Sequence, residues 1–343
     1  MENVLVTGGA GFIGSHVAEY LLNAGYNVVV LDDLSGGFVE NVEGLSAIDP
    51  NTGQKRGVLV VQGSILNHEL VNSLFAQYKF TYVYHLAAYA AEGLSHFIKR
   101  FNYQNNLVGS MNLIDAAVNH GTKCFVFTSS MAVYGSSQVP MSEDMIPAPE
   151  DSYGIAKAAV ESELAITRQM FGLDYVIFRP HNVIGPRQNI GDRYRNVVGI
   201  FMNQLLKGEP MPIFGDGEQM RAFSYIDGIV PTIADAPKVP EAIGQVFNVG
   251  GDTPSTINQL ADVVAEAMGC EKKILHLEAR HEVKLAFCSH DRVKRVFGDL
   301  PQTSLEQGIR LMAKWAKEHG ARESKAFDGI EITKNLPASW RRR

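Results

Sequence analysis

The chain has 343 residues, of which 45% are hydrophobic and 20% charged, and its formal net charge is −6. That length suffices for two domains or one large α/β unit, and the mildly acidic balance argues against a general nucleic-acid binder. No apolar run is long enough to span a bilayer, no signal-peptide pattern precedes the first strand-like run, and Cys124, Cys270 and Cys288 lack disulfide or zinc spacing. We therefore expect a cytoplasmic protein with no metal site and with neither a membrane nor a nucleic acid as partner.

The first half of the chain alternates short β-branched apolar runs with longer amphipathic segments. Most of the apolar runs do not alternate with polar residues, as expected for parallel strands that are covered on both faces. The pattern predicts an α/β protein with a doubly wound parallel sheet. The predicted strands are Val4–Thr7, Asn27–Leu31, Val58–Gln62, Tyr82–Leu86, Lys123–Ser129 and Tyr175–Arg179, and the predicted helices are Ile13–Asn23 and Val108–His120.

The second half has a different pattern. Glycine, proline and aromatic residues are concentrated between residues 180 and 217, followed by a strand at Val246–Val249 and helices at Ile257–Met268 and Leu305–His319. We predict a first domain at residues 1–179 and a smaller mixed α/β substrate domain at residues 180–343, placed at the carboxyl edge of the sheet. We also expect a late strand to return to the first domain.

Two short segments are predicted to be peripheral. Ile48–Gly57 is polar and contains glycine and proline, so it reads as a surface excursion between the second and third strands. The basic run Arg341–Arg343 reads as a frayed, solvated tail.

A glycine-rich turn follows the first strand. Gly8, Gly11 and Gly14 allow a sharp turn, close approach to a pyrophosphate and tight packing of the next helix, whose N-terminus offers amide donors to phosphates. Asp32 ends the second strand about twenty residues later, where a carboxylate accepts from an adenosine ribose diol and repels a 2′-phosphate. The spacing predicts NAD as the cofactor, in preference to NADP.

A second pattern combines a tyrosine and a lysine at helical spacing. Tyr153 and Lys157 are four residues apart and so share one helical face. A nearby ammonium favours phenolate, so Lys157 is expected to lower the pKa of Tyr153 from about 10 towards neutrality. Such a phenolate can take the proton of a sugar hydroxyl, and Ser130 at a strand end can hydrogen-bond the reacting oxygen. We predict Ser130, Tyr153 and Lys157 to be catalytic.

These motifs resemble the extended short-chain dehydrogenase/reductase family, and the resemblance covers roughly residues 3–320. The loop from Thr7 to Gly14 resembles its TGGxGFIG motif, and His85–Ala88 resembles its HLAA motif. The resemblance implies a Rossmann-type fold and a nucleotide-sugar epimerase or dehydratase similar to UDP-glucose 4-epimerase. Ser64 departs from the family's aspartate. The predicted cofactor-binding residues are Gly8, Gly11, Phe12, Ile13, Gly14, Asp32, Asp33, Ser64, Ile65, Leu86, Ala87, Ala88, Asn105, Ser129, Tyr153, Lys157, Pro180 and Asn182.

The second half carries three further family-like segments. Residues 178–188 resemble the family's RxxNVYGPRQ segment, residues 214–221 its FGDGxQxR segment, and Arg280 its later phosphate-binding arginine, although Ala222 replaces the usual aspartate. The resemblance implies that these segments hold the diphosphate and base of a nucleotide sugar, with a UDP-linked sugar as the expected partner. The predicted substrate-binding residues are Ser130, Met131, Tyr153, Asn182, Arg187, Phe214, Arg221 and Arg280.

The residues after Ser130 help to choose among reactions. In the family's 4,6-dehydratases an Asp-Glu pair stands there, whereas this chain has Met131 and Ala132, which cannot transfer protons. Epimerisation at C3 or C5 needs a further acid–base group, and Cys124 reads as a core residue. We therefore expect 4-epimerisation of the UDP-glucose/UDP-galactose type through a 4-keto intermediate, with tightly retained NAD.

Three alternatives stay open. A UDP-uronic acid 4-epimerase or decarboxylase would need a group such as His96, Arg187 or Arg193 to meet the C6 carboxylate. Another nucleotide-sugar dehydratase is a further enzymatic alternative. A non-catalytic NAD-sensing protein is the alternative from another class. The resemblance also implies a homodimer formed by helices near residues 101–120 and 153–171.

Overall fold

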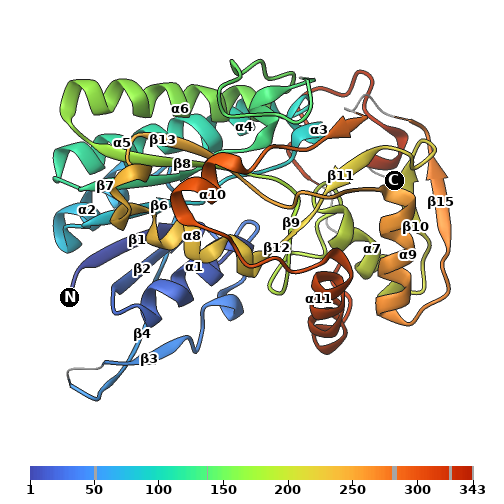
Figure 1. Cartoon of the computed structure of the whole chain (residues 1–343), viewed down its shortest axis with the longest axis horizontal. Coiled ribbons are helices and arrows are strands. Elements are labelled where there is room, and N and C mark those ends of the chain that lie inside the picture. Colours follow the sequence, from blue (N-terminus) through green and yellow to red (C-terminus); the bar gives the residue numbers. More distant parts are fainter. Residues whose placement is uncertain (50–51, 137, 280–283, 324–326, 342–343) are drawn as a thin grey trace.

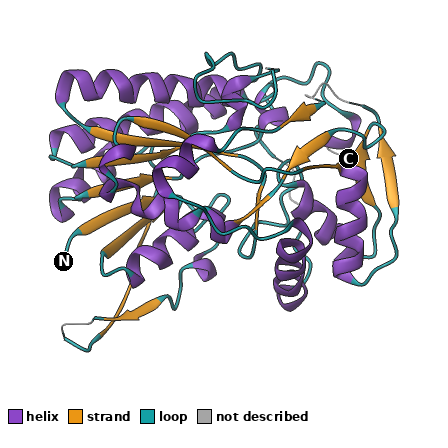
Figure 2. Ribbon diagram, viewed as in Figure 1, coloured by secondary structure: helices purple, strands orange, loops and turns teal. Residues whose placement is uncertain are grey.

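A computed structural model of the chain describes residues 1–49, 52–136, 138–279, 284–323 and 327–341. Its central feature is a seven-stranded, wholly parallel sheet, which confirms the predicted doubly wound fold (Figures 1 and 2). Within these described ranges, no helix has the length and apolar character that crossing a membrane requires. In spatial order the strands are β13 (Gln245–Val249), β8 (Asp174–Pro180), β7 (Cys124–Thr128), β6 (Tyr82–His85), β1 (Asn3–Thr7), β2 (Asn27–Asp32) and β5 (Leu59–Gln62).

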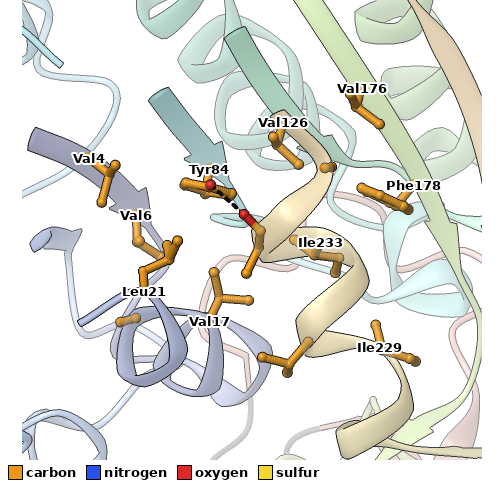
Figure 3. Close-up of a cluster of buried hydrophobic side chains, with 14 of the residues drawn as sticks. Val4, Val6, Val17, Leu21, Tyr84, Val126, Val176, Phe178, Ile229 and Ile233 are labelled. Atoms are coloured by element: carbon orange, nitrogen blue, oxygen red, sulfur yellow. Dashed lines mark hydrogen bonds between the residues drawn. The ribbon is translucent and has the colours of Figure 1, made fainter. Parts of the chain in front are cut away.

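Helices cover both faces of the sheet because its strands are apolar on both sides. In β1, Val4 and Val6 face one core cluster while Leu5 faces the other, as the two-residue period of a strand requires. The first cluster is shown in Figure 3, where the Tyr84 hydroxyl donates to the Ala234 carbonyl at 2.7 Å. One face is covered by α1 (Phe12–Asn23), α8 (Val230–Asp235) and α10 (Asp291–Phe297), and the other by α2 (His68–Tyr78), α5 (Gly109–Asn119) and α6 (Ser152–Phe171).

The second half of the chain contributes a strand and two helices to this sheet and the layers that cover it. β13 pairs with β8, with Phe247 opposite Phe178, and both rings belong to the buried core. Helix α8 packs against α1 and α10 packs against β13. The segments of residues 226–249 and 291–297 therefore build the core of the sheet although they come late in the sequence.

The remaining elements form a smaller lobe at the carboxyl edge of the sheet, on the right of Figure 1. Its three helices share one apolar core, and α9 begins with a capping box between Thr256 and Gln259. The helices are α7 (Val197–Leu206), α9 (Ile257–Met268) and α11 (Leu305–His319), and the strands are β9 (Val183–Ile184), β10 (Met211–Phe214), β11 (Met220–Ala222), β12 (Ser224–Tyr225), β14 (Pro254–Thr256), β15 (Ile274–Leu277) and β16 (Leu285–Ala286).

Short elements complete the chain. The segment expected to be a surface excursion, Ile48–Gly57, begins at the end of β3 (Ser46–Ile48) and ends with β4 (Lys55–Gly57), and these two strands pair antiparallel. Helices α3 (Glu92–Ser95) and α4 (Lys99–Tyr103) precede a π-helical turn at Gln104–Val108 that leads into α5. The short 3₁₀ turns are Val39–Asn41, Met131–Tyr134, Ile226–Gly228, Ala236–Lys238, Pro240–Ala242 and Ala338–Trp340.

Candidate functional site

The glycine-rich turn brings the start of α1 close beneath the ends of the neighbouring strands. Gly8 has φ +66°, and a Cβ there would lie 2.7 Å from the Cα of Ala87. A Cβ on Gly14 would lie 2.1 Å from the Gly8 carbonyl oxygen. Since Gly11 precedes α1 without a side chain to cap it, the first-turn N–H groups are available to an anion. The turn therefore fits the pyrophosphate of a dinucleotide.

The two carboxylates after β2 lie beside this turn. Asp32 is buried and accepts from the Ala10 N–H at 3.0 Å and the Leu34 N–H at 2.8 Å. Burial raises the pKa of Asp32, and these backbone bonds oppose the rise. Asp33 is exposed and accepts from the Ser35 N–H at 2.9 Å. The Asp32 carboxylate is thus held in place by an N–H group of the same glycine-rich turn that would bind the phosphates.

The ends of β5 and β6 supply the next group of predicted cofactor residues. Ser64 and Ile65 follow β5, while Leu86, Ala87 and Ala88 follow β6 at the same edge of the sheet. Beneath them His85 is held between the Thr7 hydroxyl at 2.7 Å and the Ser110 hydroxyl at 2.8 Å. Burial lowers the pKa of His85 far below its ordinary value, so this ring is a neutral part of the framework.

Asn105 was predicted to bind the cofactor, and the structure gives Asn105 and its neighbour Asn106 different surroundings. Asn105 donates to the Phe101 carbonyl within its own helical stretch and is not among the residues that line the cavity. Asn106 is buried, accepts from the Tyr89 N–H at 2.8 Å and donates to the Tyr89 carbonyl at 3.1 Å. Asn106 therefore holds the loop after β6, from within a π-helical turn of the kind often found at functional sites.

The three predicted catalytic residues meet at the end of β7. The Ser130 side chain acts on the Tyr153 hydroxyl and lowers its pKa, and Ser130 also accepts from the Ala132 N–H at 3.1 Å. Lys157 donates to the Thr128 carbonyl at 2.7 Å, and its Nζ lies 4.5 Å from the centre of the Phe127 ring. Helix α6 begins at Ser152, directly before Tyr153, because Asp151 caps it by accepting from the Gly154 N–H at 2.9 Å.

The expected lowering of the Tyr153 pKa is not what this environment produces. Burial raises the pKa of Tyr153 above its ordinary value, and the carboxylates of Glu92 and Asp151 raise it further, while the Ser130 hydrogen bond and Arg195 oppose the rise. Burial also lowers the pKa of Lys157 to about 7, against the opposing effect of Glu161. The prediction considered only the Lys157 charge, whereas desolvation is the largest influence on both groups.

A cavity of about 1400 Å³ runs between the sheet edge and the smaller lobe. It exceeds the ~300–1000 Å³ of ordinary small-molecule pockets and so has room for parts of two ligands. The Ser129 hydroxyl, which lies on its wall, is buried without a hydrogen-bond partner among the described residues, as expected of a group that a polar ligand would satisfy. The predicted residues that line the cavity are Phe12, Ile13, Leu86, Ala88, Ser129, Ser130, Met131, Tyr153, Lys157, Pro180, Asn182, Phe214 and Arg221.

The predicted substrate residues of the smaller lobe are only partly brought together. Asn182, with φ +41°, donates to the Ala222 carbonyl at 3.0 Å and faces the cavity beside Arg221. Arg187 instead forms an ion pair with Glu19 of α1 at 2.7 Å and lies outside the cavity lining. Arg280 falls outside the described residues.

The structure adds cavity residues that the sequence reasoning did not assign. Glu92 and Asp151 lie on the wall near Tyr153, and His96 and Arg193, considered earlier only for an acidic sugar, also line it. The C-terminal residues 338–341 line it as well. Arg341 is exposed, as expected of a solvated tail, but it is not frayed, because the buried Trp340 beside it fixes the chain against the cavity.

Comparisons with known proteins agree with this geometry. A UDP-glucose 4-epimerase of Mycolicibacterium smegmatis is 35% identical over 308 residues, which are 89% of this chain and 95% of the relative. A UDP-glucuronate 4-epimerase of Thermodesulfobacterium geofontis is 29% identical over 325 residues, 93% of this chain and 97% of that relative. The crystal structure of the UDP-glucose 4-epimerase of Thermotoga maritima with UDP-glucose matches with a TM-score of 0.84 at 35% identity, covering 92% of this chain and 99% of that chain.

A family model also matches residues 4–250, most of the chain. The match includes the glycine-rich turn, the predicted catalytic residues and the strand that returns to the sheet. It establishes NAD as the cofactor and the chain as an enzyme of the epimerase/dehydratase kind. The protein belongs to the NAD dependent epimerase/dehydratase family.

Proposed function

We propose that the protein interconverts the C4 epimers of a UDP-linked neutral hexose, of the UDP-glucose/UDP-galactose type. The observation that carries the proposal is the wall next to Ser130. Met131 and Ala132 face the cavity there, and neither can transfer the additional proton that dehydration needs. Ser130, Tyr153 and Lys157 suffice for a reversible oxidation at one carbon.

The residues of the chain divide the work. The first-turn N–H groups of α1 and the carboxylate of Asp32 are suited to hold the dinucleotide, and Lys157 is suited to its nicotinamide ribose. Bound NAD supplies the acceptor and later the donor of hydride. Tyr153 takes the proton of the C4 hydroxyl and returns it, while Ser130 fixes the oxygen between these steps. Asn182 and Arg221 bind the diphosphate from the side of the smaller lobe.

A uronic acid substrate is the second candidate. It is supported by the 29% identical UDP-glucuronate 4-epimerase and by His96 and Arg193 on the cavity wall. Against it, Glu92 and Asp151 place two carboxylates near Tyr153, and a third carboxylate at C6 of the sugar would be repelled. Arg187 does not compensate, because it is paired with Glu19.

The test is incubation of the purified protein with UDP-glucose, UDP-galactose and UDP-glucuronate separately, with products identified by NMR. We expect the two neutral hexoses to interconvert. Tyr153→Phe should lower kcat by about 10²–10⁴-fold, while Tyr103→Phe, on the outer helix α4, should not. Conversion of UDP-glucuronate alone would replace the proposal with the second candidate, and an active Tyr153→Phe variant would overturn the mechanism.

A further inference from the structure

The C-terminal segment Phe327–Arg341 lies between the residues that follow β6 and the loop before α7: the Phe327 ring meets the Tyr89 ring, and the Phe327 N–H donates to the Tyr194 hydroxyl at 3.0 Å. Four of its residues, Ala338, Ser339, Trp340 and Arg341, line the same cavity as Tyr153. Glu92 of α3, one of the charges acting on the Tyr153 hydroxyl, lines it too. Trp340 of this segment clusters with Leu94 of α3, so the segment lies against the helix that carries Glu92.

Hydrogen bonds and ring contacts attach the first part of this segment to α4. The Glu331 carboxylate accepts from the Arg100 N–H at 2.8 Å and the Phe101 N–H at 2.9 Å. The Glu331 N–H donates to the Phe97 carbonyl at 2.8 Å. The Phe327 ring lies 4.9 Å from the Phe101 ring, centre to centre. These contacts fix the first part of the segment to α4 and to Phe97, which precedes it.

Trp340 attaches the second part and joins the two lobes. It is 5% exposed and belongs to a cluster with Ala91, Leu94 and Ile98, which flank or form α3. Its ring also meets the Tyr194 ring edge-on at 5.3 Å, on the side of the smaller lobe. The neighbouring Ser339 carbonyl accepts from Arg193, another residue of the cavity wall. Trp340 thus contacts both α3 and the loop that contains Tyr194.

The proposed reaction makes retention at this end important. The C4 carbon loses a hydride to the nicotinamide and its hydroxyl loses a proton to Tyr153, and both must return to the same molecule after the ketone has exposed its other face. A keto sugar that leaves early carries away two fewer hydrogens than the substrate and strands the enzyme with reduced cofactor. The site must therefore be roomy enough for turning but closed to exit.

We propose that the segment Phe327–Arg341 is the retaining wall of the sugar site, and that Trp340 is the positioning residue that keeps it closed on the keto intermediate. This inference rests on the proposed function. Trp340 acts through the wall that it anchors, and it is not required for proton transfer.

The test compares Trp340→Ala, Trp340→Phe and the matched control Trp315→Ala, the chain's other tryptophan, which lies on α11. Three kinds of measurement are made with UDP-glucose and UDP-galactose: turnover by NMR, which gives kcat and KM, absorbance at 340 nm over time, and keto sugar in the filtrate after trapping with borodeuteride. Trp340→Ala should raise KM on the order of tenfold, release keto sugar and accumulate reduced cofactor. Trp340→Phe should restore retention, and Trp315→Ala should match the unaltered protein.

A milder variant keeps the test decisive if Trp340→Ala does not fold. Glu331→Ala removes an attachment of the segment at α4 and should leak keto sugar to a smaller extent. This inference alone is overturned if Trp340→Ala retains the keto sugar as well as an active unaltered protein does. Where Trp340→Ala does not fold, the same result with Glu331→Ala overturns it. Equal leakage from Trp315→Ala overturns it too. No turnover of either UDP-hexose by the unaltered protein overturns the proposed function, and this inference with it.

Discussion

Tyr153 lies among groups that oppose its ionisation. It is buried, and two carboxylates of the cavity wall act on it, so its phenol is a poorer acid than the four-residue spacing to Lys157 suggests. Lys157, itself desolvated to a pKa of about 7, is divided between ammonium and amine near neutral pH. Proton transfer at this site is therefore governed by the charges of the wall as well as by the tyrosine–lysine pair.

The first prediction concerns the charge of Glu92. The Glu92 carboxylate raises the pKa of Tyr153, so Glu92→Gln should lower that pKa. If phenolate is the active form, the rise of kcat with pH should move to lower pH. The measurement is a pH profile of kcat, with Glu209→Gln as the control, because Glu209 lines the same cavity but belongs to the smaller lobe. A profile that moves upward, or moves equally in the control, would contradict this account.

At the scale of elements, α6 is joined to β8 by a buried ion pair. Arg179 donates to both oxygens of Glu161, at 2.9 Å and 2.5 Å, and also to the Tyr134 hydroxyl at 2.7 Å. Tyr134 passes the connection on to Asn248 of β13 at 2.8 Å. The pair therefore fixes α6, which carries Tyr153 and Lys157, to two neighbouring strands.

The second prediction follows from the burial of that pair. Glu161→Ala leaves the guanidinium of Arg179 without its counter-charge and should lower the free energy of unfolding by about 3–5 kcal/mol. The measurement is urea denaturation followed by circular dichroism. Glu163→Ala, on the same helix but without a partner in the core, should change stability by less than about 0.5 kcal/mol. Similar losses in the two variants would show that the ion pair is not what joins these elements.

At the scale of the whole molecule, α6 exposes an apolar stripe. Ile155, Ile166 and Met170 are 43%, 53% and 68% exposed, and Val108 beside the start of α5 is 48% exposed. The spacing of the three residues on α6 keeps them on one face, and a contiguous exposed apolar face is typical of an interaction surface. We propose that this face forms the homodimer.

The third prediction tests that assembly. Ile166→Asp places a charge in the centre of the stripe and should convert a dimer of about twice 37.6 kDa into a monomer. Size-exclusion chromatography with light scattering gives the mass. The matched control is Ile146→Asp, since Ile146 is 87% exposed in the loop that precedes α6 and does not belong to the stripe. A monomeric unaltered protein, or an unchanged mass in Ile166→Asp, would remove this face as the interface.

Much of the fold could be predicted because its signals are local. Apolar runs such as Val4–Thr7 have the composition that parallel strands need when both faces are buried. Gly8 and Gly14 were recognisable by their spacing after the first strand. The structure gives the physical reason for glycine there, because a side chain at either position would collide with backbone, at Ala87 and at Gly8 respectively. The tyrosine–lysine spacing was equally readable, because a helix places residues four apart on one face.

Other features could not be read in this way because they depend on residues distant in the chain. The sequence by itself determined the parallel sheet, the nucleotide-binding turn and the tyrosine–lysine pair, all of which follow from backbone geometry over a few neighbouring residues. Only the tertiary structure decided the pKa values at the site, the pairing of Arg187 with Glu19, and the position of Trp340 on the cavity wall. Desolvation, charge proximity and packing depend on distances in space, and the fold sets those distances only when the whole chain is assembled.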